Sequence, residues 1–375
     1  MKRLFAIALT CMLPFALSAC SAAPVESSSP SQSPSESPSP SETPSIAPEI
    51  DTKNVRLAAV LKKAQRGEPV TIVALGDSIT AGSLAGGNKG YVDMMRAWWE
   101  EKFPDNKRIN IINAGIGGTT SQLGVYRTDR DALSHKPDLV IVEFINDTDS
   151  AVYKEAYEGI FRKLLGFGCA AISFEMMEYN SGRTPSKAHD PVVEEYGVPQ
   201  ISVKDELWDK LKSGELKAAD ITPDNLHPND AGHRLLSDML TGYLDGVLAD
   251  LDSFPEVEYA ELPIPITENR YYTAQIYDDM KWHGEKAGDT VTFEVSGGMV
   301  MLEYYKSPQV DNWADVEVVI DGGEPVTVSG KFPNGWGKAD ELKMLTEEGG
   351  EHTITITLVD DGNFDVIALM SSKLL

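Results

Sequence analysis

Residues 70–80 place a serine directly behind an apolar stretch. Residues 70–74 read as a buried β-strand, and Leu-Gly-Asp-Ser-Ile-Thr follows at 75–80. Open α/β sheets bind ligands at the carboxyl ends of their strands, where Ser78 would present its hydroxyl as a nucleophile. A free serine hydroxyl attacks poorly at neutral pH. By itself Ser78 predicts only a polar loop, so its chemistry depends on a base elsewhere in the chain.

Among six histidines, the strongest candidate base is His227, in Asp224-Asn225-Leu226-His227-Pro228. Asp224 can fold back in a turn and accept a hydrogen bond from one imidazole nitrogen, which leaves the other nitrogen to take the serine proton. The competing interpretation is structural, with Asp224 capping a turn and His227 as a surface neighbour. A metal site is disfavoured because no His or Cys cluster with ligand spacing accompanies the pair.

Two further loops could donate hydrogen bonds to the oxyanion that develops in acyl transfer. Residues 113–121 form a glycine-rich turn after an apolar strand at 109–112, and glycine lets backbone amides approach a ligand closely. This turn has neither Gly-x-Gly-x-x-Gly nor a following Lys-Ser/Thr, so a phosphate loop is disfavoured. After a strand at 139–144, Asn146 offers a side-chain amide.

The elements that would position these loops alternate over residues 51–250. Strands are predicted at 70–75, 109–112, 139–144, 170–174 and 199–203, and helices at 53–66, 90–102, 121–134, 153–166, 188–196, 204–213 and 230–249. Near-continuous apolar strands between amphipathic helices indicate a parallel sheet covered on both faces. After about residue 253, short alternating segments such as 290–295, 314–320 and 352–358 indicate an antiparallel, jelly-roll-like sandwich.

The amino terminus has the features of a secretory signal peptide. Two positive charges precede an apolar run at 4–17 that is too short to span a bilayer, and Leu-Ser-Ala-Cys follows at 17–20. This last stretch resembles the lipobox of bacterial lipoproteins, which implies a lipid on Cys20 as the membrane anchor. The competing interpretation is an ordinary signal peptidase site. The chain is thus predicted to be an exported, surface-anchored protein.

The composition sets the remaining divisions of the chain. Residues 20–50 are dominated by Ser and Pro and predict a disordered spacer. We therefore expect a signal peptide at 1–19, the spacer at 20–50, an α/β domain at 51–252 and a β-sandwich at 253–375.

A net charge of −25 argues against nucleic acid as a partner. Cys169 is expected to be a buried thiol.

Taken together, four segments resemble the SGNH or GDSL hydrolase family in order and approximate spacing: Gly76-Asp77-Ser78, the glycine turn, Asn146-Asp147 and Asp224-x-x-His227. The resemblance covers roughly residues 68–248. It implies a three-layer α/β/α fold and a serine esterase that works through an acyl-enzyme without a metal or organic cofactor. It also implies that Ser78 is the nucleophile, His227 the general base and Asp224 the carboxylate that orients it.

The resemblance further assigns the oxyanion hole. The backbone amides of Ser78 and Gly118 and the side chain of Asn146 would donate to the oxyanion, with Gly117 as the fallback for Gly118. The family usually has Gly-x-Asn-Asp in the third block, whereas here Phe144 stands where glycine is expected or one residue is deleted. A bulky residue at this point could shift the end of the strand and with it the Asn146 amide.

The expected substrate is an acetylated carbohydrate. An acidic, surface-tethered hydrolase with an attached sandwich suggests a polysaccharide deacetylase whose sandwich stacks sugars on Tyr304, Tyr305, Trp313 or Trp336. These aromatic residues could equally fill the core of the sandwich. One alternative function is a lipolytic or short-chain acyl esterase. Another is a surface glycan-binding lipoprotein whose hydrolase domain has lost activity.

Overall fold

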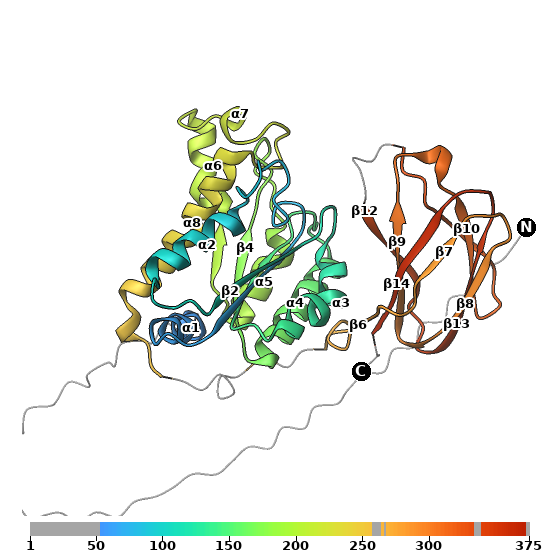
Figure 1. Ribbon diagram of the computed structural model, residues 1–375, viewed down its shortest axis with the longest axis horizontal. Helices are drawn as coiled ribbons and strands as arrows, with labels where there is room; N and C mark the ends of the chain where they lie inside the picture. Colours follow the sequence, from blue (N-terminus) through green and yellow to red (C-terminus); the bar gives the residue numbers. More distant parts are fainter. Residues whose placement is uncertain (1–52, 257–263, 266–267, 334–338, 373–375) are drawn as a thin grey trace, which may run out of the picture. The chain divides into compact units, whose positions relative to one another are not determined.

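The computed structural model describes residues 53–256, 264–265, 268–333 and 339–372 (Figure 1). The predicted signal peptide, Cys20, the Ser/Pro spacer and Trp336 lie outside the described residues. The expectations attached to them therefore stay predictions. Within the described part of the chain, no helix combines the length and the apolar character that crossing a membrane requires.

A parallel sheet carries the predicted site loops. It consists of β1 (Val70–Gly76), β2 (Ile109–Gly115), β3 (Leu139–Glu143), β4 (Ala170–Glu175) and β5 (Gln200–Ser202), in the order β2-β1-β3-β4-β5. All neighbouring strands run in the same direction. The chain places β2 on one side of β1 and β3 on the other, so the strand order reverses at β1. Such a switch point opens a crevice at the carboxyl ends of the strands, where open α/β sheets bind ligands.

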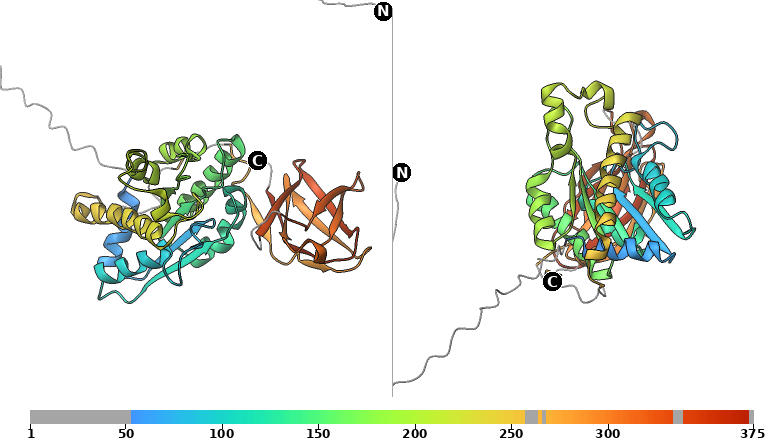
Figure 2. Two further views of the ribbon diagram at one scale, coloured as in Figure 1. Left: turned by 90° about the horizontal axis from the view of Figure 1, so that it is seen from above. Right: turned by 90° about the vertical axis from the view of Figure 1, so that its left-hand side faces the viewer.

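Helices cover both faces of this sheet (Figures 1 and 2). Alternate residues of β1 divide between two apolar clusters: Val70, Ile72 and Ala74 face one side, and Val73 and Leu75 face the other. The first cluster takes its helical side chains mainly from α1, α2, α6 and α8, and the second from α3, α4 and α5. The predicted three-layer α/β/α architecture is therefore confirmed.

The helices lie close to their predicted positions. They are α1 (Val55–Gln65), α2 (Tyr91–Lys102), α3 (Ser121–Asp131), α4 (Ala151–Phe167), α5 (Ser186–Tyr196), α6 (Val203–Ser213), α7 (Ala218–Ile221) and α8 (Asp230–Ala249). Helix α8 begins where predicted because the Asn229 side chain accepts hydrogen bonds from the amides of Ala231 and Gly232. The predicted helix at 121–134 ends early, at Asp131, and a 3₁₀ turn, η1 (Leu133–His135), replaces its last turn. The one-turn helix α7 carries no apolar period and was not predicted.

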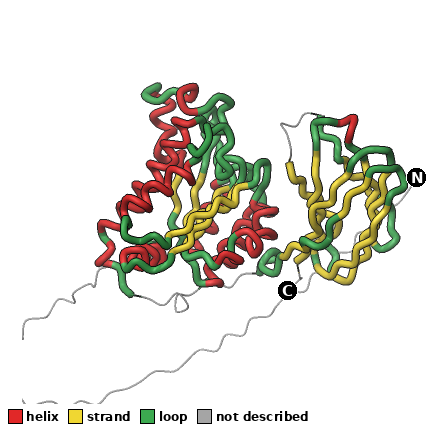
Figure 3. Tube along the Cα trace, viewed as in Figure 1, coloured by secondary structure: helices red, strands yellow, loops and turns green. Residues whose placement is uncertain are grey.

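The carboxy-terminal part consists of two antiparallel sheets, and Figure 3 shows the change from mixed helix and strand to strand and loop. One sheet has the order β11-β10-β13-β8 and the other β12-β9-β14-β6, with β7 also paired to β14. The strands are β6 (Gln275–Tyr277), β7 (Trp282–Gly284), β8 (Thr290–Gly297), β9 (Met299–Lys306), β10 (Asp315–Ile320), β11 (Val326–Ser329), β12 (Ala339–Thr346), β13 (Gly350–Leu358) and β14 (Phe364–Ser372). An apolar cluster between the sheets makes this part the expected β-sandwich.

Polar contacts tie the segment before β6 to the helices α3 and α4. Arg270 forms a two-pronged ion pair with Glu155, with Nε–Oε1 at 3.1 Å and Nη2–Oε2 at 2.8 Å. The buried ammonium group of Lys163 donates to the carbonyl of Ala274 at 2.5 Å and to Asp129 at 2.8 Å. Residues 270–274 are therefore bound to the α/β part just before the first strand of the sandwich begins.

Candidate active site

Strand register brings three of the four predicted motifs to one edge of the sheet. Gly76, at the end of β1, is paired with Gly115 of β2 and with Glu143 of β3. The residues that follow each of these strands therefore emerge side by side: Ser78 after β1, the glycine turn after β2 and Asn146 after β3. The fourth motif reaches this edge through the loop between α7 and α8.

The structure brings Ser78, His227 and Asp224 into one line of hydrogen bonds. The Oγ atom of Ser78 lies 3.0 Å from Nε2 of His227, and Nδ1 of His227 lies 2.7 Å from Oδ2 of Asp224. Ser78 is 6% exposed, so its hydroxyl is largely shielded from water but still reachable. One imidazole nitrogen faces the carboxylate and the other faces the hydroxyl, which is the arrangement that proton transfer from serine requires.

The loop around His227 is shaped by Asp224 itself. Its Oδ1 atom accepts hydrogen bonds from the amides of Leu226 and His227 at 3.0 and 2.7 Å, while Oδ2 accepts from the imidazole. Asn225 adopts a left-handed conformation with φ +66°, which closes the turn. Partial burial acts to raise the pKa of Asp224, but the hydrogen bonds from His227 and Leu226 outweigh it and lower the pKa below its ordinary value. The carboxylate is therefore held ionised beside the imidazole.

The glycine turn lies beside the serine. A Cβ atom placed on Gly117 would lie 3.7 Å from Cβ of Ser78, and Gly118 has φ +77°, a conformation that side chains strain. The turn is held by the Thr119 hydroxyl, which donates to the carbonyl of Ile116 at 2.8 Å. Gly117 therefore lies next to the nucleophile, and Gly118 follows it in a backbone conformation that favours glycine.

Asn146 also lies at this edge, with its side-chain amide fully engaged. Its Nδ2 atom donates to Oδ2 of Asp77 at 2.9 Å and to the carbonyl of Thr119 at 3.0 Å. These two bonds use both amide hydrogens. To donate to an oxyanion, Asn146 would have to exchange one of them, and the bond to the Thr119 carbonyl is the one that joins it to the glycine turn.

The structure explains how Phe144 is accommodated in the third block. Its ring is 2% exposed and points into the apolar core, away from the site. Gly124 of α3 leaves the space, because a Cβ atom there would lie 2.4 Å from Cζ of Phe144. The anticipated shift of the strand end is therefore relieved by a glycine in the facing helix.

Several side chains that hold this loop were not predicted. Arg183 donates to the carbonyls of Asp147 and Ile145 at 3.0 and 3.2 Å. The buried carboxylate of Asp147 accepts from the amide of Ser121 at 2.9 Å and meets Nε2 of His189 at 2.9 Å. These contacts join segments far apart in the sequence, so no local pattern could have revealed them. They fix the loop that carries Asn146.

A buried arginine ties two of the strand ends together. Arg127 of α3 is fully buried and donates to the carbonyls of Gly76 and Ala114 at 2.8 and 2.7 Å. The first carbonyl belongs to β1 and the second to β2, just before the serine and the glycine turn. Asp131 meets the same guanidinium at 3.0 Å. Arg127 therefore holds the ends of β1 and β2 at a fixed separation, and with them the serine turn and the glycine turn.

The aromatic residues proposed to stack sugars divide between core and surface. Tyr304 is buried against Phe364 with ring centroids 5.4 Å apart, because its strand position faces the inside of the sandwich. The expectation that Tyr304 stacks a sugar is therefore wrong. Tyr305 points to the opposite face, is partly exposed and stacks on Trp313 at 4.6 Å. Cys169 is a buried free thiol, as expected.

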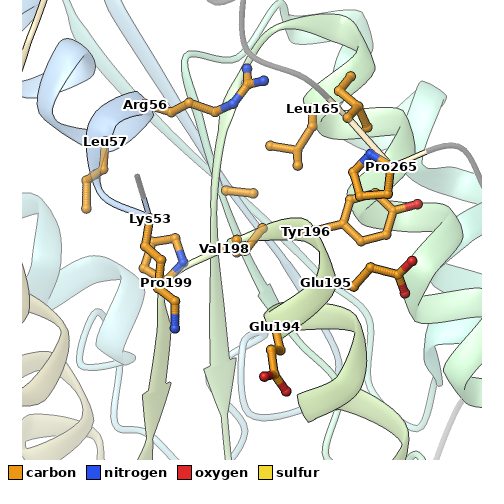
Figure 4. Close-up of a pocket in the computed structure, with 13 residues that line it drawn as sticks. Lys53, Arg56, Leu57, Leu165, Glu194, Glu195, Tyr196, Val198, Pro199 and Pro265 are labelled. Carbon is orange, nitrogen blue, oxygen red and sulfur yellow. The ribbon is translucent and has the colours of Figure 1, made fainter. Parts of the chain in front are cut away.

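A cavity of about 570 Å³ lies away from the serine (Figure 4). Its lining includes Ala171 near the start of β4, Val198 and Pro199 just before β5, and Leu57 of α1. The starts of parallel strands lie at the edge of the sheet opposite to their ends. This cavity is therefore separate from the site around Ser78. Among the described residues there is also no group of three or more His, Cys, Asp or Glu side chains that could hold a metal ion.

Comparisons with known proteins agree with this arrangement. Residues 74–235 match the model of the GDSL-like Lipase/Acylhydrolase family. The crystal structure of a two-domain esterase (CEX) active on acetylated mannans is 30% identical, with a TM-score of 0.79 over 86% of this chain and 96% of that chain. A crystal structure of such an esterase with mannopentaose gives a TM-score of 0.78 at 30% identity, over 86% and 95% of the two chains.

A curated relative matches less than half of this chain. Thioesterase 1/protease 1/lysophospholipase L1 of Escherichia coli strain K12 is 25% identical over 185 residues, which span 46% of this chain and 83% of that protein. The family match includes Ser78, the glycine turn, Asn146 and the Asp224–His227 loop, and the likeness to the two-domain esterase continues through the sandwich. This chain is a member of the GDSL-like lipase/acylhydrolase family, with a β-sandwich following the hydrolase fold.

Proposed function

We propose that the protein is a serine esterase that removes acetyl groups from a carbohydrate through an acyl-enzyme. One observation carries the proposal: the continuous hydrogen-bonded line from Asp224 through His227 to Ser78 at the switch point of the sheet. Membership of an acylhydrolase family and the likeness to a carbohydrate esterase support it. The two parts of the proposal, the chemistry and the substrate, rest on separate evidence.

The chemistry follows from the positions of the proton donors and acceptors. His227 takes the Ser78 proton on Nε2 while Oγ bonds to the acyl carbon, and the carbonyl π electrons move to the oxygen. The tetrahedral intermediate collapses, the bond to the alcohol breaks, and His227 gives the proton to the departing oxygen. Water then attacks the acetyl-serine with His227 again as base. Acetate leaves, and Ser78 regains its proton.

The oxyanion would be stabilised by the backbone amides of Ser78 and Gly118 and by the Asn146 side chain. Each such donor lowers the barrier by about 3 kcal/mol. The resting bond from Asn146 to the Thr119 carbonyl would be exchanged for a bond to the oxyanion, while the bond to Asp77 holds the amide in place. Asn146 is thus a donor that becomes available when substrate arrives.

An uncharged polysaccharide is the favoured substrate class. The two-domain esterase named for its activity on acetylated mannans resembles this chain over both the hydrolase fold and the sandwich. A net charge of −25 also disfavours a strongly acidic polymer. Tyr305 and Trp313 of the sandwich remain candidates for sugar contact, whereas Tyr304 does not.

A lipolytic esterase is the second candidate. It is favoured by one relative, named as a thioesterase and lysophospholipase, that matches 46% of this chain. The likeness to the carbohydrate esterase spans 86% of this chain and therefore accounts for more of it. The third interpretation, a glycan-binding protein with an impaired hydrolase site, rested on Phe144. It loses its main support, since Phe144 points into the core and leaves the neighbouring loop hydrogen-bonded.

Acetate release from polysaccharides separates these candidates. Residues 51–375 would be assayed with acetylated mannan, acetylated xylan and a lysophospholipid, and in parallel with p-nitrophenyl acetate and octanoate. We expect acetate release from a polysaccharide, preference for the acetate ester, and loss of both activities in Ser78→Ala. Preference for octanoate and lysophospholipid would support the lipolytic candidate. Binding without any turnover would contradict the esterase proposal.

We also propose that Cys20 carries the lipid that anchors the protein to the membrane. The support is the sequence alone, in which Leu-Ser-Ala-Cys closes a short apolar segment at 17–20. Growth of the expressing bacteria with labelled palmitate should label the full-length protein, and Cys20→Ala should abolish the label. A labelled Cys20→Ala protein, or an unlabelled wild type, would contradict the proposal.

A further inference from the structure

Two carboxylic side chains lie buried beneath the nucleophile. Asp77 directly precedes Ser78, and Glu143 is the last residue of β3, whose end is paired with the end of β1. Both side chains are fully buried. Neither exchanges a proton or forms a bond with substrate in the acyl-transfer steps proposed above, although Asp77 holds the Asn146 amide and Glu143 contacts the serine turn.

Asp77 joins the serine turn to Asn146. Its Oδ2 atom accepts hydrogen bonds from the backbone amide of Asn146 at 3.2 Å and from the Asn146 side chain at 2.9 Å. Its Oδ1 atom accepts from the amide of Ile79 at 3.1 Å, which holds the turn around Ser78. Moving the Asp77 carboxyl group would therefore disturb both the nucleophile and the side-chain oxyanion donor.

Glu143 makes a matching set of contacts from the other strand. Its Oε2 atom accepts from the hydroxyl and amide of Thr80 at 2.7 and 3.3 Å and from the amide of Asp77 at 3.4 Å. Its Oε1 atom accepts from the amide of Ile145 at 3.0 Å. Glu143 thus ties the turn that follows Ser78 to the loop that leads to Asn146.

No described cation neutralises this pair. Among the residues that the structure describes, no Lys, Arg or His nitrogen lies within 4 Å of either carboxyl group, and Arg127 donates to the Gly76 carbonyl rather than to them. Burial, and then the charge of Glu143, raise the pKa of Asp77 well above its ordinary value, and burial raises the pKa of Glu143. Two full negative charges so close together in a dry core would be strongly unfavourable.

The tyrosines around the pair are uncharged. Tyr91 of α2 forms a hydrogen bond through its hydroxyl to the Thr80 hydroxyl at 2.9 Å. The negative charge of Glu143 contributes to the raised pKa of Tyr157 of α4 and of Tyr179 after β4. Burial raises the pKa of all three tyrosines above the ordinary value, so none supplies a charge at neutral pH. These tyrosines therefore do not offset a second negative charge on the pair, and Arg127 makes no ion pair with either carboxyl group among the described residues.

We infer that Asp77 and Glu143 hold one proton between them at neutral pH and act together as positioning residues for Ser78 and Asn146. The pair then carries a single negative charge, spread over hydrogen bonds from both loops. Loss of the shared proton would set two carboxylates against each other and push the loops apart. The catalytic consequence rests on the proposed esterase function, whereas the shared proton does not.

Infrared spectroscopy of the enzyme without substrate tests the proton directly. At pH 8, residues 51–375 should show a protonated carboxyl band that is lost in Asp77→Asn. Glu175→Gln is the matched control, because burial raises the pKa of Glu175 only to about 7 and its carboxyl is mostly ionised at pH 8. This variant should keep the band. Absence of the band from the wild type, or its persistence in Asp77→Asn, would overturn the inference whatever the activity of the protein.

Kinetics test the positioning role. Asp77→Asn keeps the size of the side chain but replaces one accepting oxygen with an NH2 group, so one of the bonds from Ile79 or Asn146 is lost and kcat should fall about tenfold with KM nearly unchanged. Loss of the shared proton should make the kcat of the wild type decline at alkaline pH, and this decline should be absent from the variant, which has no shared proton to lose. A residue that merely stabilised the fold would lower the melting temperature and leave the pH profile of kcat unchanged. An unchanged alkaline decline in Asp77→Asn would therefore contradict the positioning role.

Discussion

At the scale of single residues, the site divides into side chains that act on substrate and side chains that hold them. We assign Ser78 and His227 to the first group and Asp224 to the orientation of the imidazole, and all three belong to short motifs. Asp224 and His227 are three residues apart, so their contact is local and the turn that joins them could be predicted. The hydrogen bond between Ser78 and His227 joins residues 149 positions apart, so its prediction depended on the family resemblance.

Replacing His227 with alanine tests the general base. His227→Ala should reduce kcat at least about 10³-fold, because His227 is the base that the described residues place within hydrogen-bond distance of Ser78 Oγ. The side chain is partly exposed, so the melting temperature should change little. Steady-state kinetics and thermal unfolding on the same preparation check both statements. A variant that retained a tenth of the activity would rule out His227 as the base.

Replacing Asn146 with alanine tests the side-chain oxyanion donor. Asn146→Ala should lower kcat about 10²-fold, since one donor to the oxyanion is lost. Thr119 offers a control: Thr119→Ser keeps the carbonyl and the hydroxyl and should leave kcat nearly unchanged. A loss of less than about threefold in Asn146→Ala would remove Asn146 from the oxyanion hole.

The supporting residues could not be read from the sequence. Glu143 appears there as one residue within the strand predicted at 139–144, and only the register of β3 against β1 places it beside the turn that carries Ser78. Arg183 reaches the Asn146 loop from a turn after β4. Such contacts depend on the order of strands in the sheet, which the spacing of residues along the sequence does not predict.

At the scale of elements, the carboxyl ends of β1, β2 and β3 set the geometry of the site. The parallel sheet was predictable because its buried strands are continuous apolar runs. The sandwich was predicted less completely, since β6 and β7 have three residues each and β9 and β14 are too evenly buried to show alternation. Only strands with one wet face, such as β8 and β13, show the alternating pattern clearly.

Helix α3 must keep Gly124 for the third block to fit. Gly124→Ala would force a Cβ atom against the Phe144 ring, 2.4 Å from Cζ, and should destabilise the fold by about 1–3 kcal/mol. It should also lower kcat, because Phe144 leads into the Asn146 loop. Urea unfolding and kinetics measure the two effects. Adding Phe144→Leu should restore part of each, and a double variant no better than Gly124→Ala would contradict this account.

The end of β4 makes stability depend on pH. Burial, and then the charge of Asp190, raise the pKa of Glu175 from 4.5 to about 7. Between these values the folded state keeps a proton that the unfolded state has lost, so the stability contributed by Glu175 falls as pH rises from about 4.5 to about 7 and is level above.

Glu175→Gln should remove this dependence. The gain in unfolding free energy relative to the wild type should grow from pH 4.5 and reach about 3 kcal/mol near pH 8. Urea unfolding at several pH values measures it. A constant difference between the two proteins across this range would show that Glu175 does not titrate in the folded state as described.

At the scale of the whole molecule, the hydrolase fold and the sandwich are joined by more than a connecting chain. Methionines of β9 and β14, namely Met299, Met301 and Met370, share an apolar cluster with the helices α3 and α4. Arg130 of α3 also pairs with Asp278 at 3.0 Å. These contacts explain why the residues of β9 and β14 that face away from the core of the sandwich are also apolar. Because both faces are apolar, neither strand shows the alternation of apolar and polar residues from which a strand is predicted. They indicate that the sandwich contributes to the core of the described molecule.

The central claim is that Ser78 is a nucleophile activated by His227, and covalent labelling tests it most directly. Residues 51–375 would be treated with a fluorophosphonate ester, digested and analysed by mass spectrometry. We predict one adduct, on the peptide that contains Ser78, formed at least about 10²-fold more slowly in His227→Ala. An unlabelled wild type, or an adduct on another residue with Ser78 unmodified, would contradict the account.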